Sequence, residues 1–522
     1  MYQIKDLIGQ IPFAADLYDM LQKQPPRTRF NLRQLDQFAD DQLATLKAIP
    51  ADPDKNKHIL LFATLHYWIE QAAVIAVVLQ KLGYKVTVAY LPYSSWDKPV
   101  NKLDLKRQDL YAARVLKKFS QFFDTVSLLR VKPSGTLPPG FNAKIQLAAS
   151  YDTMYTLQVE DFDPHTELYQ LRLQRNEAAA RHVFGLFAKT KPDIVLIPNG
   201  LVTELGVWFQ ASKHLGLDTV TYEFNDQREQ IWISHTDVVM NQNTDEIWAA
   251  KKDTPLDEEQ YSQIAAFEDA RSSAKKFGKG TRFWQDVASV GGQAQRQALG
   301  LDDRPVVLLA TNVLGDSLTL GRNIFTASMA EWIAKTVVYY SQHPQAQLVV
   351  RIHPGERLMK GPSSIDVINR TLPSIPENIK IIGPLEKVNT YDLMEIADLG
   401  LVYTTTVGLE MAMRGVPVIV AGKTHYRGRG FTYDPANYED NFAITAQLLE
   451  NTASKRLSQT QIDTAWNYAY RFFFEYPRPF PWRLMKFWED LQEWPIQCIL
   501  SPEGRGSFTK TFSALAGEPI DW

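Results

Sequence analysis

The sequence predicts an α/β protein with two domains, each containing a parallel β-sheet flanked by helices. Two separate stretches, at 51–300 and 301–461, alternate short apolar runs with longer helical segments. Such alternation is typical of strand–helix–strand units with parallel strands. The length of 522 residues exceeds what one hydrophobic core usually supports, and 45% hydrophobic and 22% charged residues are ordinary for a globular protein.

The first stretch follows a helical N-terminal extension, predicted at 1–50, which ends in the linker AIPADPDKNK. HILLFATL at 58–65 and YKVTVAYL at 84–91 predict buried strands, and the segment between them predicts a helix, so this unit is expected to be parallel. Further strands are expected at 123–131, 193–198 and 218–224, helices at 167–190 and from about 201 to 215, and bridging helices in the charged stretch 243–300.

The second stretch repeats this alternation with at least four strands. They are expected at VVLLATN (306–312), QLVVRI (347–352), NIKII (378–382) and LGLVY (399–403), with helices between them. The aromatic-dense tail at 462–522 is expected to form helices that pack back on the first domain.

Composition excludes several classes of function. The formal charge of −3 excludes nucleic acid as the main partner, because tracking phosphates requires a basic excess. A single cysteine, Cys498, excludes intramolecular disulfides and cysteine-rich metal sites. The histidines show no metal-ligand spacing, and the chain contains neither a leader-like N-terminus nor an apolar run of about 18 residues, the length a membrane span requires. A cytoplasmic protein is therefore expected.

The most informative segment is 399–432, LGLVYTTTVGLEMAMRGVPVIVAGKTHYRGRGFT. It predicts a strand, a turn with the hydroxyls of Thr404, Thr405 and Thr406, a short helix, a second strand and a glycine-rich loop. Hydroxyls and backbone N–H groups at a helix start suit an anion, although such threonines are more often simple caps. Glu410 lies four residues after Thr406, one too many for a capping box, and can instead accept from ribose hydroxyls.

His353 directly follows QLVVRI and is expected at the carboxyl end of that strand, where α/β sheets bind ligands. His343 lies between a helix and a strand, and is expected in a surface turn at the opposite edge. Glu356 suits either a ligand or a solvated surface position. In the 425–432 loop, Arg427 and Arg429 suit a phosphate or a sugar carboxylate, or else remain solvated.

TTTVGLEMAMRGVPVIVAGKTHYRGRGFT at 404–432, together with RIHPGE at 351–356, resembles the bacterial capsule polysaccharide biosynthesis family, which includes Kdo transferases. The resemblance implies a GT-B glycosyltransferase, whose two Rossmann-like domains face a cleft: an acceptor domain at 51–300 and a nucleotide-sugar domain at 301–461. It implies that His353 contacts the donor phosphate and is catalytic. It gives the phosphate to Thr404, Thr405 and Thr406 and the ribose to Glu410. The other residues expected to bind the donor are Pro354, Glu356, Gly408, His425, Tyr426, Arg427, Gly428, Arg429, Gly430 and Thr432.

A catalytic base is expected from the first domain, where the sequence offers less guidance. Asp226, just after the strand at 218–224, is the preferred residue. The other acceptor-side candidates follow predicted strands or end them; they are His66, Asn199, Gly200, Glu204 and Glu223.

The resulting hypothesis is a bacterial, metal-independent glycosyltransferase that moves a sugar, with Kdo the leading choice, to a glycan or glycolipid acceptor of the cell surface. CMP-Kdo or a UDP-sugar would be the co-substrate, and no cofactor is expected. Peripheral association with the inner face of the membrane is part of this hypothesis. A UDP-N-acetylglucosamine 2-epimerase-like enzyme and a non-catalytic scaffold for polysaccharide export are the alternatives.

Overall fold

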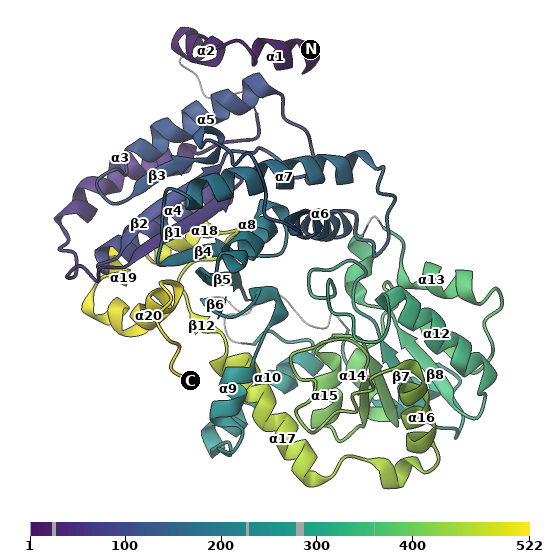
Figure 1. Ribbon diagram of the computed structural model, residues 1–522. Helices are drawn as coiled ribbons and strands as arrows, with labels where there is room; N and C mark the ends of the chain where they lie inside the picture. The colour runs from purple at the N-terminus through teal and green to yellow at the C-terminus, as the bar shows by residue number, and fades with distance from the viewer. Residues whose placement is uncertain (1, 23–27, 226–228, 278–286, 360) are drawn as a thin grey trace. The chain divides into compact units, whose positions relative to one another are not determined.

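The computed structural model describes residues 2–22, 28–225, 229–277, 287–359 and 361–522 (Figure 1). The chain forms two compact units. Unit 1 contains Met1–Thr153, Asp163–Met240 and Arg478–Asp521, and unit 2 contains Met154–Phe162, Asn241–Pro477 and Trp522. Each unit is an α/β assembly around its own sheet, so the predicted fold class, with two Rossmann-like domains, a helical N-terminus and a helical tail, is confirmed.

The sheet of unit 1 has the strand order β12-β6-β5-β4-β1-β2-β3. Strands β1 to β5 are parallel, whereas β6, at one side, pairs antiparallel with both β5 and β12. The bounds are β1 (His58–Thr64), β2 (Lys85–Leu91), β3 (Asp124–Ser127), β4 (Ile194–Pro198), β5 (Asp218–Phe224), β6 (Gln230–Ser234) and β12 (Arg478–Pro479). The chain leaves β1 toward β2 and β3, then crosses to β4 and β5 on the other side. The switch point therefore lies between β1 and β4, the place where open α/β sheets bind ligands.

Helices cover both faces of this sheet. Their bounds are α1 (Tyr2–Ile8), α2 (Ala14–Gln22), α3 (Arg33–Ala48), α4 (His66–Lys81), α5 (Lys102–Lys117), α6 (Phe141–Leu157, which ends in unit 2), α7 (Glu167–Phe187), α8 (Thr203–His214), α18 (Phe487–Glu493), α19 (Ile496–Ile499) and α20 (Pro502–Leu515), with a 3₁₀ turn at Leu128–Arg130.

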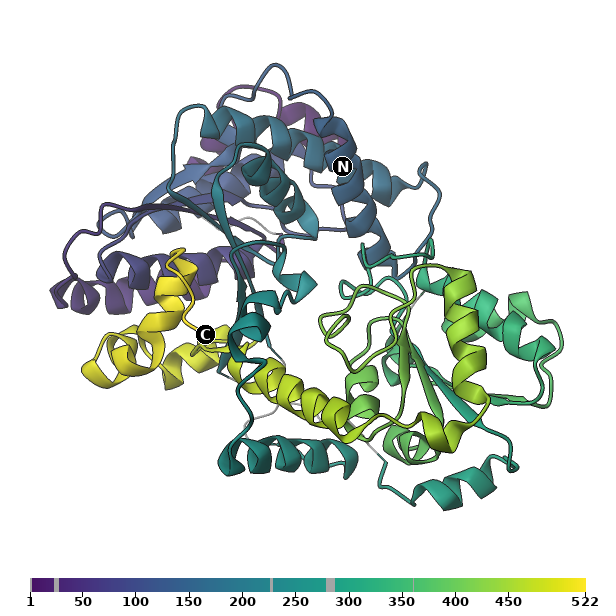
Figure 2. The ribbon, with the colours of Figure 1, turned by 60° about the horizontal axis from the view of Figure 1, so that its bottom comes forward.

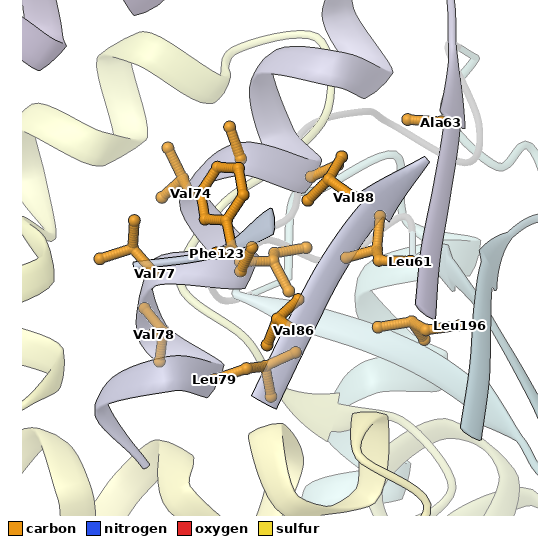
Figure 3. Close-up of a cluster of buried hydrophobic side chains, with 14 of the residues drawn as sticks. Leu61, Ala63, Val74, Val77, Val78, Leu79, Val86, Val88, Phe123 and Leu196 are labelled. Carbon is orange, nitrogen blue, oxygen red and sulfur yellow. The ribbon is translucent and has the colours of Figure 1, made fainter. Parts of the chain in front are cut away.

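The main core of unit 1 lies between α4 and the strands β1, β2 and β4 (Figure 3). Leu61 and Ala63 point to this side, and Phe62 points to the other, where its ring stacks on Trp208 of α8 at 4.2 Å between centroids. Because both faces are covered, β1 is apolar on both sides and its sequence shows no alternation. Trp482 and Phe512 of the C-terminal tail belong to the same core.

The sheet of unit 2 is parallel, with the order β11-β10-β7-β8-β9. Helices lie on both of its faces (Figure 2). The strands are β7 (Val306–Ala310), β8 (Gln347–Arg351), β9 (Ile379–Ile382), β10 (Leu399–Val402) and β11 (Val418–Val420). The helices are α9 (Asp245–Lys251), α10 (Glu258–Ser272), α11 (Gly292–Ala298), α12 (Met329–Gln342), α13 (Ser364–Thr371), α14 (Thr390–Ile396), α15 (Val407–Met413), α16 (Tyr438–Leu449) and α17 (Gln459–Tyr470), with short turns at Val239–Asn241, Pro354–Leu358, Thr452–Lys455 and Arg471–Glu475.

The unit boundaries divide the predicted domain at 51–300 and the predicted tail at 462–522. The bridging helices expected at 243–300 are α9, α10 and α11, and all three belong to unit 2. The aromatic tail divides at Pro477, since α17 belongs to unit 2 and Arg478–Asp521 to unit 1. Among the described residues, no helix combines the length and the apolar character that crossing a membrane requires.

Candidate functional site

The strands of unit 2 all end at one edge of their sheet, which we call the carboxyl edge of unit 2. His353 follows β8 at this edge, and Thr404, Thr405 and Thr406 follow β10. His343 lies at the opposite edge, between α12 and β8, where its Nδ1 donates to Tyr339 O at 2.6 Å and its ring stacks on Tyr339 at 3.9 Å. The two histidines thus occupy opposite edges, as the order of the elements predicts.

Thr311 and Asn312 link the two polar turns, and the sequence analysis did not single them out. They follow β7, which lies between β8 and β10. The hydroxyl of Thr311 accepts from His353 N at 2.9 Å, and Asn312 Oδ1 accepts from Thr404 N at 3.1 Å. Two polar residues directly after a central strand were the signal that could have identified them.

His353 is exposed, and its Nδ1 accepts from Gly355 N at 3.0 Å. A neutral imidazole that accepts at Nδ1 carries its proton at Nε2, which is therefore a hydrogen-bond donor. A Cβ at Gly355 would lie 2.8 Å from this Nδ1, so the glycine permits the close turn that orients the ring. The arrangement suits donation to an anionic oxygen.

The three threonines have different surroundings. Thr404 Oγ1 donates to Leu318 O at 3.2 Å, and the carbonyl of buried Thr405 accepts from Tyr426 OH at 2.6 Å. Thr406 precedes α15, and within the described chain its hydroxyl does not cap that helix. The simple-cap interpretation therefore does not apply to Thr406. Since α15 has only seven residues, the hydroxyls and His353, rather than a helix terminus, carry the case for an anion site.

Gly408 and Tyr426, both predicted to bind the donor, pack against one another beneath the threonine turn. A Cβ at Gly408 would lie 2.4 Å from Tyr426 OH, a distance that no real contact allows. Tyr426 is fully buried. The two residues therefore support the threonine turn by packing beneath it.

Glu410 is predicted to accept from ribose hydroxyls, but the structure gives its carboxylate another partner. Its Oε1 forms a short ion pair with Arg271 Nη2, and the two side chains are 2% and 3% exposed. Tyr391 OH also accepts from Arg271 Nε, at 3.2 Å. The position of Glu410, one residue beyond that of a capping box, is thus explained by its ion pair with Arg271 of α10, which is 139 residues away in sequence.

Glu356 is predicted to be either a ligand contact or a solvated surface acid. The structure instead buries its side chain. Its Oε2 accepts from Ser364 N at 3.0 Å and its Oε1 from Ser364 Oγ at 2.6 Å, at the start of α13. Its carboxylate therefore stabilises the chain that follows Pro354 and is not directed to a ligand at the carboxyl edge of unit 2.

The 425–432 loop is held by contacts within unit 2. His425 is buried, stacks on Phe472 at 3.7 Å and shares a hydrogen bond with Tyr468 OH at 3.0 Å; burial lowers its pKa, so the ring is neutral. Arg427 donates to the carbonyls of Val420 and Pro435, and Arg429 pairs with Asp245 at 2.6 Å.

The remaining loop residues follow the same pattern. Gly428 N donates to Asp434 Oδ2 at 2.8 Å, Gly430 O accepts from Gln461 Nε2 at 3.3 Å, and Thr432 Oγ1 donates to Asp434. Both glycines have positive φ and open space where a Cβ would lie, so backbone conformation, not close approach, requires them. Arg427 and Arg429, which are predicted to bind a phosphate or a sugar carboxylate, thus bind other groups of unit 2 in this structure.

The acceptor-side candidates lie at the carboxyl edge of unit 1, where β1, β4 and β5 end. His66 begins α4 after β1, and Asn199 and Gly200 follow β4. Asn199 Nδ2 donates to Glu223 Oε2 at 2.8 Å. Gly200 has φ +82° and a Cβ there would lie 2.8 Å from Thr221 Cγ2, so it serves the turn.

Glu204 has a partner that the other acceptor-side candidates lack, and Asp226 stays a prediction. Glu204 is buried in an ion pair with Arg172 at 2.9 Å, and Arg172 also pairs with Asp152. A carboxylate committed to a buried arginine is a poor proton acceptor, because the cation favours its charged form. Asp226, the preferred base, lies outside the described residues.

Comparison with solved structures finds distant likenesses. A β-Kdo 2,4 transferase, KpsC of Thermosulfurimonas dismutans, is 16% identical over 56% of this chain and 82% of its own, with a TM-score of 0.36. A β-Kdo 2,7 transferase, KpsC of the same organism, is 13% identical over 63% of this chain and 97% of its own, with a TM-score of 0.34. The UDP-GlcNAc 2-epimerase of Neisseria meningitidis is 13% identical over 80% of this chain and 100% of its own, with a TM-score of 0.27.

At such low identities and TM-scores, these likenesses do not establish what this chain binds or catalyses. Comparison with curated protein sequences gives no match. The family comparison is more specific: residues 293–470 match capsule polysaccharide biosynthesis protein. This range contains the His353 turn, the threonine turn and the 425–432 loop, the same segments that carry the sequence resemblance. Residues 293–470 of this chain are thus similar to the capsule polysaccharide biosynthesis protein family.

Proposed function

We propose that this protein is a glycosyltransferase that moves a sugar from a nucleotide-sugar donor to a glycan or glycolipid in capsule or other cell-surface polysaccharide synthesis. The observation that carries the proposal is the convergence of exposed His353 with the Thr404–Thr406 turn at one sheet edge, inside the region that matches the capsule family. Kdo, delivered as CMP-Kdo, is the leading sugar, and a UDP-sugar is the next choice.

The proposed reaction requires electrostatic stabilisation at the carboxyl edge of unit 2. When the bond between the anomeric carbon and the phosphate oxygen breaks, the nucleotide leaves with the electron pair and negative charge grows on its phosphate. The Nε2–H of His353 and the hydroxyl of Thr406 are donors suited to that charge, whereas the hydroxyl proton of Thr404 goes to Leu318 O. One such donor is worth roughly 10² to 10³ in rate when it acts on developing charge.

We propose further that the protein works without a bound metal or cofactor, in the bacterial cytoplasm at the inner face of the membrane. Peripheral association is supported by the apolar side chains that α1, α2 and the turn between them expose, among them Leu7 at 65%, Phe13 at 79% and Leu21 at 77%. Exposed apolar helix faces of this kind favour a membrane surface or a partner protein.

A thermal-shift comparison of CMP, UDP and GDP with the full-length protein tests nucleotide binding. A ligand at 100 times its dissociation constant adds about 2.7 kcal/mol to the free energy of unfolding, which is a readily measured shift. The expected result is selective stabilisation by CMP, which His353→Ala weakens and His343→Ala leaves unchanged. Stabilisation by none of the three would contradict the donor site.

Product analysis with the preferred nucleotide-sugar then tests transfer. Transfer that requires an added glycan acceptor supports the proposal. Conversion of the nucleotide-sugar without any acceptor would instead identify an epimerase, and nucleotide binding without turnover on any acceptor would identify a scaffold.

A further inference from the structure

A tryptophan is exposed on the loop at residues 92–101, which joins β2 to α5 and which we call the Trp96 loop. Because β2 is parallel to β1, the loop begins at the carboxyl edge of unit 1, the edge that carries the acceptor-side candidates. Trp96 is 39% exposed, whereas the other tryptophans of the described residues are buried or half-buried. Asp97 and Lys98, which follow it, are exposed as well. The loop therefore presents an indole ring beside two polar side chains.

Two arginines of α7 hold the main chain of the Trp96 loop. Arg175 Nη1 donates to Ser95 O at 2.7 Å, and its Nη2 donates to Lys98 O at 2.6 Å. Arg172 Nη1 donates to Trp96 O at 2.9 Å. Hydrogen bonds from a charged donor are roughly twice as strong as those between neutral groups. Three of them therefore fix the backbone at Trp96 and on both sides of it.

Arg175 is a buried cation that the loop itself satisfies. Within the described chain it forms no ion pair, in contrast to Arg172. Its guanidinium lies over the ring of Tyr93, with 4.2 Å between Cζ and the ring centroid. A buried charge without a carboxylate partner is unfavourable unless hydrogen bonds satisfy it, and here the loop carbonyls accept those bonds.

Glu204 supports the same loop indirectly. It pairs with Arg172, and Asp152 pairs with the same arginine, so a set of buried charges in unit 1 ends at the backbone of an exposed loop. Residues 94–98 are half-buried or exposed, so little of the entropy lost in ordering them is offset by burial of apolar area. A loop held rigid in this way is preorganised for a ligand, because binding then costs less conformational entropy.

We propose that the Trp96 loop is a saccharide-binding platform, in which the indole face of Trp96 stacks on a sugar ring of the acceptor. This inference rests on the proposed function, which makes a glycan or glycolipid the acceptor. One face of a sugar ring carries C–H groups, and their partial positive charge is attracted to the negative face of an indole. The carboxylate of Asp97 accepts from the sugar hydroxyls, and the ammonium of Lys98 donates to them. Arg175 is the positioning residue, which holds the indole in place through the loop backbone.

The composition of the loop favours a saccharide over a protein partner. Ser94 and Ser95 precede Trp96, and Asp97 and Lys98 follow it, so the exposed ring stands alone among polar residues of the loop. Docking surfaces for proteins bring several apolar side chains together. A sugar ring is smaller than such an interface and has an apolar face with a rim of hydroxyls, which matches one indole flanked by polar groups.

Affinity electrophoresis of the full-length protein tests the platform. Native gels are cast without additive or with dextran, hyaluronan or colominic acid, which are one neutral and two acidic polysaccharides. The parent protein is expected to be retarded in at least one of them. Trp96→Ala should bind that polysaccharide roughly tenfold or more weakly, the loss typical of a central aromatic contact. Trp96→Phe, which keeps a ring, should remain retarded.

Tyr261→Ala is the control, because it removes an exposed aromatic side chain from α10 in unit 2 and should be retarded like the parent. Circular dichroism verifies that each variant is folded. The proposal is overturned if none of the three polysaccharides retards the parent, or if Trp96→Ala is retarded as strongly as the parent.

Arg175→Lys tests the positioning role. It keeps the charge, but an ammonium lacks the guanidinium fork that reaches both Ser95 O and Lys98 O. Polysaccharide binding should therefore weaken. In a Trp96→Ala background the same substitution should weaken binding no further, since Arg175 acts through Trp96. An additional loss in the double variant would show that Arg175 serves the fold and not the platform.

The platform and the proposed function can fail separately, because polysaccharide binding and nucleotide binding are measured independently. If CMP stabilises the protein and transfer occurs, but no polysaccharide retards the parent, only the platform fails. If retardation depends on Trp96 and no nucleotide stabilises the protein, the proposed function fails and the saccharide site of unit 1 stands.

Discussion

Arg271 and Glu410 form a buried ion pair that joins α10 to α15 in unit 2. A second pair joins the same helices one turn along, where Arg414 Nη2 lies 2.7 Å from Glu268 Oε1. Burial and the nearby Glu410 raise the pKa of Glu268 to about 7. The helix that follows the threonine turn is therefore fixed by charges from a helix distant in sequence, and the position of Thr406 depends on that support.

Glu410→Ala is expected to destabilise the protein by about 3–5 kcal/mol, because it leaves Arg271 buried and uncompensated. Denaturant unfolding measures this loss, and Glu439→Gln, an exposed acid on α16, is the control that should leave the unfolding free energy unchanged. Replacing both partners with apolar residues, Arg271→Met with Glu410→Leu, should recover most of the loss. Unchanged stability of Glu410→Ala with weakened nucleotide binding would instead restore the ribose contact.

His353→Ala is expected to lower kcat/KM for transfer by roughly 10² to 10³ with no change in unfolding temperature, since the exposed ring contributes little packing but donates to growing charge. His343→Ala removes a ring at the opposite edge and should leave kcat/KM unchanged. Steady-state kinetics of the two variants, measured in parallel, tests this difference in kcat/KM. Equal activities would remove the case for the carboxyl edge of unit 2 as the donor site.

Glu70 on α4 predicts a pH dependence of stability that is independent of function. Burial raises its pKa from the ordinary 4.5 to about 7, against a hydrogen bond from Trp488 Nε1 at 3.1 Å. The folded state thus holds a proton that the unfolded state releases, so stability is greatest below the unfolded pKa and falls as the pH rises toward 7, by about 3 kcal/mol. Glu70→Gln should raise the unfolding temperature at pH 8 but not at pH 4. The same shift at both pH values would rule out this linkage.

Transfer is expected to continue in the presence of EDTA. The carboxylates of Glu356 and Glu410, which follow β8 and β10, are committed to Ser364 and Arg271 and do not offer ligands to a metal. The measurement is initial rate with EDTA, and with EDTA followed by excess Mg²⁺. Loss of activity that Mg²⁺ restores would show that the reaction is metal-assisted.

Much of the local structure could be predicted from the sequence, because the strands are short apolar runs that lie between clear turn signals. β1, β4, β7, β8 and β10 lie within two residues of where their apolar runs place them. β6 and β12 were not predicted, since β12 is a two-residue strand whose pairing partner lies almost 250 residues away. The edge positions of His353 and His343 followed from element order, because parallel strands put all their carboxyl ends on one side.

What the sequence by itself determined is therefore the fold class, the resemblance of 351–356 and 404–432 to the capsule polysaccharide biosynthesis family, and the polar turns at the carboxyl edge of unit 2. Only the tertiary structure decided which charged residues are available for chemistry. Glu410, Glu356, Glu204, Arg427 and Arg429 have the residue types of a site, yet each is engaged by a partner within its own unit. The physical reason is that a buried charge requires a partner, and that partner comes from whichever element the fold packs against it, at a sequence distance that no local pattern encodes.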